Sequence, residues 1–241
     1  MKIALIGYGK MGKEIEQIAL SRGHSIVLKV DITNASTYSV DELKQADVAI
    51  EFSTPESAIG NMYKCFDANV PVVVGTTGWL NKLEEVKLKC NQQNQTLFYA
   101  SNYSIGVNLF FKLNAHLAKL MNAYPEYNVT MEEIHHVHKL DAPSGTAISL
   151  ANQVIENMER KNKWVNNTSE NKNELEIISK RLEEVPGTHT VSYNSAVDEI
   201  SITHIAHNRK GFALGAVIAA EFVKGKKGIF GMNELMGTDN E

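Results

Sequence analysis

The sequence has little of several features that would assign a protein to a specialised class. Its 241 residues include only two cysteines, Cys65 and Cys90, whose spacing suggests neither a disulfide framework nor a cysteine metal site. No apolar stretch reaches the roughly 18 residues that span a bilayer, and no internal repeat is present. The net charge of −4 leaves no basic surface for nucleic acid. We therefore expect a cytoplasmic protein without a membrane or nucleic-acid partner.

The composition, with 43% hydrophobic and 22% charged residues, is typical of a globular protein of one large domain or two modest ones. Glycines and charged residues follow the apolar run Lys2–Ile6 at once, so a buried strand is expected there rather than a signal sequence. Up to Tyr103, such runs alternate with segments of helical periodicity, which predicts parallel βαβ units and a doubly wound sheet. The expected strands are Lys2–Ile6, Ser25–Val30, Asp47–Phe52, Val70–Val74 and Thr96–Ala100, and the expected helices are Lys13–Ser21, Pro55–Asn69 and Asn81–Asn91.

The pattern changes after Tyr103. Strands follow one another there without intervening helices, which predicts a second domain with a mostly antiparallel open sheet. A final apolar helix, Gly211–Val223, is expected to pack back onto the first domain. The other expected elements are helices Gly106–Ala123 and Ala147–Arg160, a polar exposed loop Lys161–Asn173, and strands Asn128–His138, Glu174–Lys180, His189–Asn194 and Asp198–His207.

The glycine pattern that follows the first strand is typical of a dinucleotide-binding turn. Gly7 permits the tight turn, Gly9 lets the backbone approach a pyrophosphate, and Gly12 brings the helix close to the strand. Asp31 ends the next strand and is placed to bind an adenosine ribose. Its carboxylate repels a 2′-phosphate, whereas Lys10 could approach one, so the sequence leaves NADH or NADPH open as the cofactor. The loop contributes Gly7, Tyr8, Gly9, Lys10, Met11 and Gly12.

Two turns of small and polar residues follow later strands of the first domain. They are Gly75–Gly78 and Ala100–Tyr103, the latter with Ser101 and Asn102. Because the carboxyl ends of parallel strands face the ligand crevice, both turns could line the nicotinamide, with Thr76, Thr77 and Asn102 as polar contacts. These residues are also good loop formers, so spacing alone leaves the role of both turns open. The same holds for Phe52–Pro55.

The segment Glu133–Ala147 gathers His135, His136, His138, Lys139 and a Ser-Gly-Thr turn. Three interpretations compete. Zinc binding is disfavoured because His136 and His138 share a strand face while His135 points away, and no nearby glutamate completes a metal spacing. A purely structural role is the second. The third, which we favour, is that the histidines and Lys139 hold a substrate and supply protons. Ser144, Gly145 and Thr146 would bind a carboxylate at the start of a helix.

Two further features near this segment have less defined roles. Asp141 and Pro143 are expected to shape the turn and cap the helix that follows. Arg209 could be a second carboxylate clamp or a solvated charge, and the second interpretation is slightly favoured.

Taken together, these residues resemble those of the dihydrodipicolinate (4-hydroxy-tetrahydrodipicolinate) reductase family of lysine and diaminopimelate biosynthesis. The resemblance covers nearly the whole chain, and the run Glu133–Ala147 is its most specific part. Lys10 and Val137 stand where arginine is common in the family, at positions without an assigned chemical role. The other matching motifs are Gly7–Gly12, Phe52–Pro55, Gly75–Gly78 and Asn102–Val107.

The resemblance implies an α/β fold. It consists of a Rossmann-type doubly wound parallel sheet, from residues 1–104 and 212–241, and an α+β substrate-binding and tetramerisation domain with an open mixed sheet, from 105–211. It also implies reduction of a cyclic dicarboxylate by NADH or NADPH in a homotetramer, without a metal. His135 matches a proton donor and acceptor, and Lys139 a proton donor. The substrate-carboxylate site is matched by His136, Ser144, Gly145 and Thr146, and the nicotinamide side by Gly75–Thr77 and Ala100–Tyr103.

Two rival functions remain at the level of sequence. Another two-domain Rossmann oxidoreductase, such as an amino-acid or sugar dehydrogenase, would lack the combined His-His-x-x-Lys and Ser-Gly-Thr motifs. A redox-sensing regulator would need a basic DNA-reading element, which the sequence does not contain.

Overall fold

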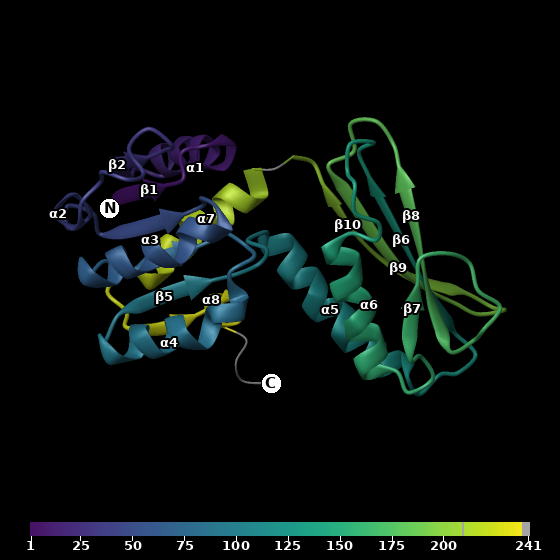
Figure 1. Ribbon diagram of the computed structural model, residues 1–241. Coiled ribbons are helices and arrows are strands. Elements are labelled where there is room, and N and C mark those ends of the chain that lie inside the picture. Colours follow the sequence, from purple (N-terminus) through teal and green to yellow (C-terminus); the bar gives the residue numbers. More distant parts are fainter. Residues whose placement is uncertain (209, 238–241) are drawn as a thin grey trace. The chain divides into compact units, whose positions relative to one another are not determined.

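The computed structural model describes residues 1–208 and 210–237 (Figure 1). The chain folds into two compact units, Met1–Ser104 with Lys210–Glu241, and Ile105–Arg209. Helices long and apolar enough to cross a membrane do not occur in the described part of the chain. Both cysteines are buried and free.

The first unit is built on a parallel sheet with the strand order β11-β5-β4-β3-β1-β2. This confirms the doubly wound sheet expected from the alternating pattern. The sequence did not predict β11, because three residues are too few to show a strand periodicity. The strands are β1 (Lys2–Ile6), β2 (Ser25–Val30), β3 (Val48–Glu51), β4 (Val72–Val74), β5 (Thr96–Tyr99) and β11 (Gly228–Phe230).

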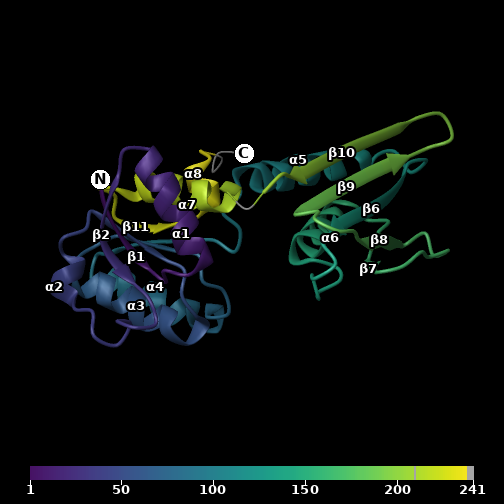
Figure 2. The ribbon, with the colours of Figure 1, turned by 90° about the horizontal axis from the view of Figure 1, so that it is seen from above.

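Helices cover both faces of this sheet (Figure 2). One face carries α1 (Lys10–Ser21) and α7 (Lys210–Val223), and the other carries α3 (Pro55–Asp67) and α4 (Leu83–Gln92). The expected return of the last long helix is confirmed. Its buried side is rich in alanine, and at Gly215 a Cβ atom would lie 1.8 Å from the Tyr103 carbonyl oxygen. Short helices are α2 (Val40–Leu43), a 3-10 turn (Leu80–Lys82) and α8 (Met232–Leu235).

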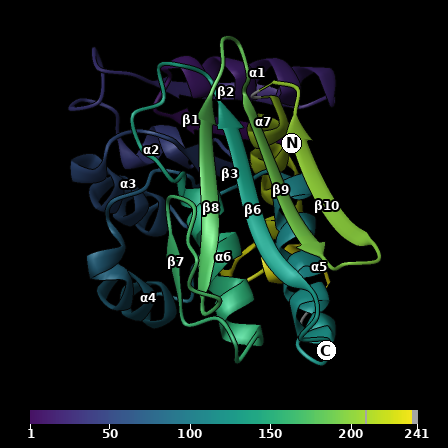
Figure 3. The same cartoon turned by 90° about the vertical axis from the view of Figure 1, so that its right-hand side faces the viewer.

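The second unit contains a mixed sheet with the order β10-β9-β6-β8-β7 (Figure 3). This confirms the mixed sheet that the resemblance implies, whereas the mostly antiparallel sheet expected from the strand pattern is only half right. The pairs β10–β9 and β9–β6 are antiparallel, whereas β6–β8 and β8–β7 are parallel, because the chain crosses over through a helix between β6 and β8. The strands are β6 (Asn128–His135), β7 (Lys163–Val165), β8 (Glu174–Arg181), β9 (Gly187–Asn194) and β10 (Glu199–Ala206).

The prediction of an exposed loop at Lys161–Asn173 is wrong in part. This polar segment contains the short edge strand β7, which its composition does not reveal, and Lys161 is only 4% exposed. The Lys161 ammonium donates to the Glu174 carbonyl oxygen at 2.7 Å and to Asn128 Oδ1 at 3.1 Å. Those bonds compensate for the burial of its charge, which a composition argument does not anticipate.

Two helices, α5 (Ile105–Met121) and α6 (Gly145–Asn157), cover one face of the mixed sheet (Figure 1). Alternate residues of β6 and β9 point into the core beneath them, as the two-residue period of a strand requires. The core includes Val129, Met131, Leu150, Val191 and Tyr193.

Candidate active site

The buried face of β6 and β9 is apolar along most of its length and becomes polar at one end. On β6, Val129 and Met131 are followed at the same alternation by Glu133 and His135, all buried. Glu133 pairs in register with His189 of β9, which is also buried. The row of buried side chains on β6 and β9 therefore ends in a carboxylate and two imidazoles. Because these groups are buried, they need hydrogen-bond partners within the protein.

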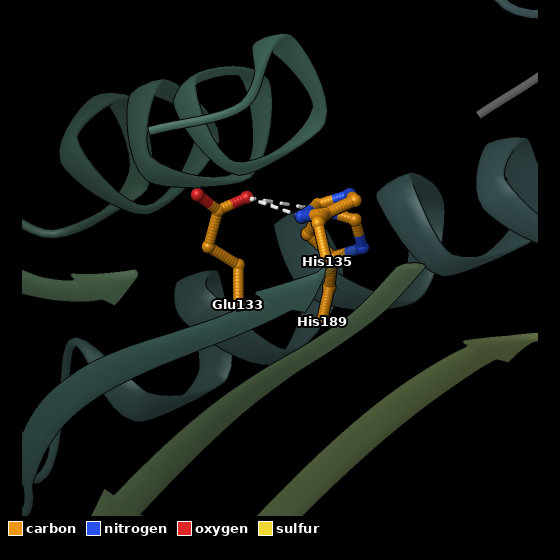
Figure 4. Close-up of side chains that lie close together, drawn as sticks. All are labelled: Glu133, His135 and His189. Atoms are coloured by element: carbon orange, nitrogen blue, oxygen red, sulfur yellow. Dashed lines mark ion pairs between the residues drawn. The ribbon is translucent and has the colours of Figure 1, made fainter. Parts of the chain in front are cut away.

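The two oxygens of Glu133 have different surroundings. Oε1 accepts a hydrogen bond from the Ser144 backbone N–H at 3.1 Å and lies 3.3 Å from Arg181 Nη2. Oε2 lies 3.1 Å from His135 Nδ1 and 3.8 Å from His189 Nε2 (Figure 4). Burial by itself raises the pKa of Glu133, but His135 and Ser144 outweigh it and hold that pKa well below its usual value. The side chain is thus a buried carboxylate at neutral pH.

His189 is tied to the helix that follows the motif. Its Nε2 lies 3.0 Å from the Ser144 hydroxyl, and its ring is 5.0 Å from that of His135 in an edge arrangement. Burial, and then the nearby His135, lowers the pKa of His189 to about 4. His189 is therefore neutral at pH 7. His189 lies outside the sequence motifs, although its alternation with Val191 and Tyr193 places it on the buried face.

The loop after β6, which carries Lys139, is held by contacts with Asp141 and Arg181. The Lys139 ammonium contacts both oxygens of Asp141, at 2.7 and 2.8 Å. Arg181 donates to the backbone carbonyl oxygens of Lys139 and Asp141, at 3.3 and 2.6 Å, as well as contacting Glu133. One guanidinium therefore connects the loop that carries Lys139 to the buried carboxylate, a role that the sequence did not indicate.

The predicted anion-binding turn is the first turn of α6. The Ser144 hydroxyl accepts from the Ala147 backbone N–H at 3.2 Å, so Ser144 caps the helix. The expectation that Asp141 caps this helix is wrong, because its carboxylate pairs with Lys139. Gly145 and Thr146 then lie at the helix N-terminus, where N–H groups lack partners within the helix and favour an anion.

The predicted strand face of His136 and His138 is also wrong. β6 ends at His135, and Leu182 N–H donates to the His135 carbonyl oxygen at that end. His136 and His138 lie in the turn that follows, with ring centroids 6.3 Å apart. His136 is partly buried and His138 exposed. Arg209 lies outside the described residues.

Glu133, His135 and His189 also offer ligand atoms within 4.8 Å of one another, a group found by searching the described residues. The premise that no glutamate lies near the histidines is therefore incorrect. However, the Arg181 guanidinium stands 3.3 Å from Glu133, and Ser144 engages His189 Nε2. A fixed cation beside the carboxylate opposes a metal ion, so the arrangement favours proton transfer.

The glycine loop of the first unit has the geometry that a dinucleotide requires. Gly7 has φ +96°, and a Cβ there would lie 2.0 Å from the Phe52 carbonyl oxygen. At Gly12 a Cβ would lie 2.5 Å from the Gly7 carbonyl oxygen, whereas at Gly9 it would meet nothing within 4 Å. Gly7 and Gly12 are thus needed for packing, and Gly9 leaves open space at the N-terminus of α1. This fits the approach of a pyrophosphate.

The rest of the loop lies against the end of β2. The backbone N–H groups of Gly7 and Tyr8 donate to the Val30 carbonyl oxygen at 2.9 and 2.8 Å, which brings the loop beside Asp31. Asp31 Oδ1 accepts from the backbone and the hydroxyl of Thr33. Tyr8 donates its hydroxyl to Glu16, and Lys10 is exposed and Met11 partly buried.

The two later turns lie at neighbouring strand ends of the same sheet. Thr76 Oγ1 accepts from the Ser53 backbone N–H at 2.8 Å, and Gly75 fits against the Phe52 ring, which a Cβ would meet at 2.1 Å. Thr77 and Ser101 are exposed, while Gly75, Ala100 and Asn102 are partly buried. The Tyr103 side chain is instead a core residue, and its hydroxyl donates to the Val74 carbonyl oxygen at 2.7 Å.

A second buried carboxyl, Glu51, ends β3 beneath these turns and was not predicted to matter. It accepts from Asn61 Nδ2 and from the Ser53 backbone N–H, both at 3.2 Å. Burial raises its pKa, although these hydrogen bonds act in the opposite direction. Glu51 thus connects β3 to the turn that contacts Thr76.

A parallel sheet with an open glycine loop, joined in one chain to a mixed-sheet unit with buried titratable groups, is typical of a two-domain nicotinamide-dependent oxidoreductase. Sequence profiles narrow this class. Residues 1–103 match the N-terminal part of dihydrodipicolinate reductase, and residues 106–236 match its C-terminal part. The chain therefore belongs to the dihydrodipicolinate reductase family.

Individual relatives agree with this membership. A protein of Christiangramia forsetii named 4-hydroxy-tetrahydrodipicolinate reductase is 48% identical over 236 residues, covering 98% of this chain and 98% of its own. A protein of the same name from Neisseria gonorrhoeae is 31% identical over 233 residues, covering 93% of this chain and 85% of its own. The dipicolinate-bound dihydrodipicolinate reductase of Paenisporosarcina sp. TG-14 shares the fold, with a TM-score of 0.75 and 23% identity over 96% of this chain and 97% of its own.

Proposed function

We propose that this protein reduces 4-hydroxy-tetrahydrodipicolinate, after its dehydration to dihydrodipicolinate, to tetrahydrodipicolinate in lysine and diaminopimelate biosynthesis. The observation that carries the proposal is the position of His135 beside the N-terminus of α6. Glu133 contacts both the His135 imidazole and the Ser144 backbone N–H. Glu133 therefore holds a proton-exchanging imidazole close to a helix N-terminus that can bind a carboxylate.

Each predicted residue has a task in this reaction that suits its surroundings. His135 exchanges a proton with the substrate, and Lys139 supplies a cation and a proton. His136 and the first turn of α6, with Ser144, Gly145 and Thr146, bind the substrate carboxylates. Lys139 is held by Asp141 at 2.7 Å, so it must exchange this partner for the substrate as it takes up its role.

NADH or NADPH would bind at the first unit. When bound, the reduced nicotinamide supplies the hydride. The open space above Gly9 and the N-terminus of α1 fit the pyrophosphate, and Asp31 fits the ribose. Gly75–Thr77 and Ala100–Tyr103 lie at the carboxyl ends of β4 and β5, where the nicotinamide half would bind. Asp31 is compatible with NADH, and Lys10 with NADPH.

We also propose that the protein is cytoplasmic and forms a homotetramer through its second unit, residues 105–211, which binds the substrate. The two free cysteines suit a reducing compartment. Apolar side chains exposed on both faces of the edge strand β10 and in the turn before it support association along this edge of the sheet; they are Val197, Ile200 and Ile205. Light scattering of the purified protein distinguishes a tetramer from a monomer.

The decisive experiment follows the oxidation of NADH and of NADPH by the purified protein, with dihydrodipicolinate synthase supplying fresh substrate. Oxidation that depends on the synthase is expected with at least one cofactor. No oxidation with either would overturn the proposed function. His135→Ala and Lys139→Ala should each lower turnover by roughly 100-fold or more while cofactor binding persists. Full activity in both variants would contradict the assigned proton-transfer roles.

A further inference from the structure

We propose that Glu133 is a positioning residue that fixes the tautomer and direction of His135 and holds it at a set place relative to the N-terminus of α6. The inference rests on the proposed function, because it concerns how the proton-exchanging imidazole is prepared. It gives a task to a buried carboxylate that is not among the predicted site residues.

One oxygen of the buried Glu133 carboxylate keeps an open acceptor position. Oε1 is occupied by the Ser144 backbone N–H and the Arg181 guanidinium. Oε2 is buried, and within the described residues neither it nor His135 Nδ1 makes a hydrogen bond, although they lie 3.1 Å apart. A buried anionic oxygen without a donor is unfavourable, because nothing replaces the hydrogen bonds that it made to water. A small rotation of the imidazole lets Nδ1–H donate to Oε2, so this tautomer is the stable one.

The other ring nitrogen of His135, Nε2, faces away from Glu133 and towards Gly187. With the Nδ1 proton held by Glu133, His135 Nε2 is the atom that gives and takes protons. It lies against Gly187, where a Cβ would come within 3.0 Å of it. The absence of a side chain at Gly187 therefore keeps space at this nitrogen.

Among the charged and titratable groups around His135, Glu133 is the anion that faces its ring. Glu133 faces it from β6, Arg181 pairs with it in register on β8, and His189 faces it from β9. His189 is neutral at pH 7 and engaged with Ser144, so Glu133 is the anion that stabilises a protonated His135. Lys139 of the adjoining loop is a cation balanced by Asp141.

The proton balance of the step is simple. The Nε2–H bond of the His135 imidazolium breaks, and its proton moves to the substrate. The substrate atom that accepts the proton supplies the electron pair of the new bond. The ring is left neutral with Nδ1–H still bonded to Glu133, and Nε2 takes its next proton from solvent. Because Glu133 also holds Ser144, a substrate carboxylate on the first turn of α6 lies at a fixed distance from Nε2.

The test combines a tautomer measurement with kinetics. In the ¹⁵N NMR spectrum of the full-length protein, with His135 assigned by its loss in His135→Gln, neutral His135 should carry its proton on Nδ1. Glu133→Gln places an amide at the same position and should move the proton to Nε2. It should also lower kcat by about 100-fold or more, with the KM for the cofactor unchanged.

Glu132→Gln is the matched control, since Glu132 is the preceding residue of β6 and pairs with Lys180. It should leave both the tautomer and kcat unchanged. An Nε2–H tautomer in the unmodified protein overturns the inference without any variant, even if Glu133→Gln fails to fold. A loss of kcat below tenfold in a folded Glu133→Gln overturns it as well. If the unmodified protein lacks activity altogether, the proposed function fails, while the NMR result still decides the positioning role.

Discussion

Glu133 and His189 face each other across β6 and β9, paired in antiparallel register, with Oε2 of one 3.8 Å from Nε2 of the other. On one side along these strands the core row is apolar, with Met131 paired with Val191, and on the other side it continues with His135. At this pair the buried face of the second unit changes from apolar to polar side chains. It is stabilised by Arg181 and Ser144 rather than by solvent.

His189 should make the second unit sensitive to acid. Its folded-state pKa of about 4 lies below the ordinary value of 6.5, so neutral His189 contributes stability that is complete above pH 6.5 and is lost as the pH falls towards 4. The difference corresponds to about 3 kcal/mol. Glu133 acts in the same direction, but only below the ordinary glutamate pKa of 4.5.

This acid sensitivity is measurable by urea unfolding at pH 7.0 and pH 4.8. In a Trp79→Phe background, Trp164 of β7 reports on the second unit alone, since the chain has two tryptophans. His189→Gln should reduce the loss of stability between the two pH values, and His116→Gln, at an exposed position of α5, should not. Equal losses in all three proteins would show that His189 is not the titrating group.

Two glycines of the loop should separate binding from folding. Gly9→Ala adds a Cβ that meets nothing within 4 Å, so stability should be unchanged while the Kd for NADH and NADPH rises about tenfold or more. Gly12→Ala places a Cβ 2.5 Å from the Gly7 carbonyl oxygen and should destabilise the fold by about 1–3 kcal/mol. Fluorescence titration and thermal unfolding measure the two effects. Unchanged cofactor affinity in Gly9→Ala would show that the pyrophosphate does not bind beside Gly9.

Gly187→Ala should impair turnover without affecting the cofactor. The added Cβ would lie 3.0 Å from His135 Nε2, so the imidazole must shift by a few tenths of an ångström. A loss of kcat of about tenfold is expected, because acid–base catalysis depends on position. Gly60→Ala on α3 meets nothing within 4 Å and serves as the control. Normal steady-state kcat in Gly187→Ala would argue against Nε2 as the reactive nitrogen.

Arg181→Lys should weaken the loop that carries Lys139. A lysine keeps the charge but cannot donate at once to Glu133 and to the carbonyl oxygens of Lys139 and Asp141, as the guanidinium does. Loss of such charge-assisted bonds should lower kcat/KM about 10- to 100-fold. Arg22→Lys, which alters a comparable fork to Glu221 in the first unit, should leave kcat/KM unchanged. Equal effects of both substitutions would indicate a general loss of stability.

Much of the first unit could be predicted because its signals are local. The five-residue apolar strand and the Gly7–Gly12 spacing are adjacent in sequence, and close contacts at Gly7 and Gly12 leave no room for a larger residue. The short strand β11 and the parallel pairing of β6 with β8 were missed. Both depend on which distant segments pair, and the pattern within a strand does not encode its partner.

The sequence by itself determined the class of fold, the glycine loop and the segment that carries His135, Lys139 and Ser144. Their motifs are contiguous, so local spacing is sufficient. Only the tertiary structure decided that Glu133 faces His135 and His189, that Arg181 braces the Lys139 loop, and that Gly187 leaves room at Nε2. These residues come from different strands, and the pairing of β6 with β8 and β9 is what brings their side chains within bonding distance.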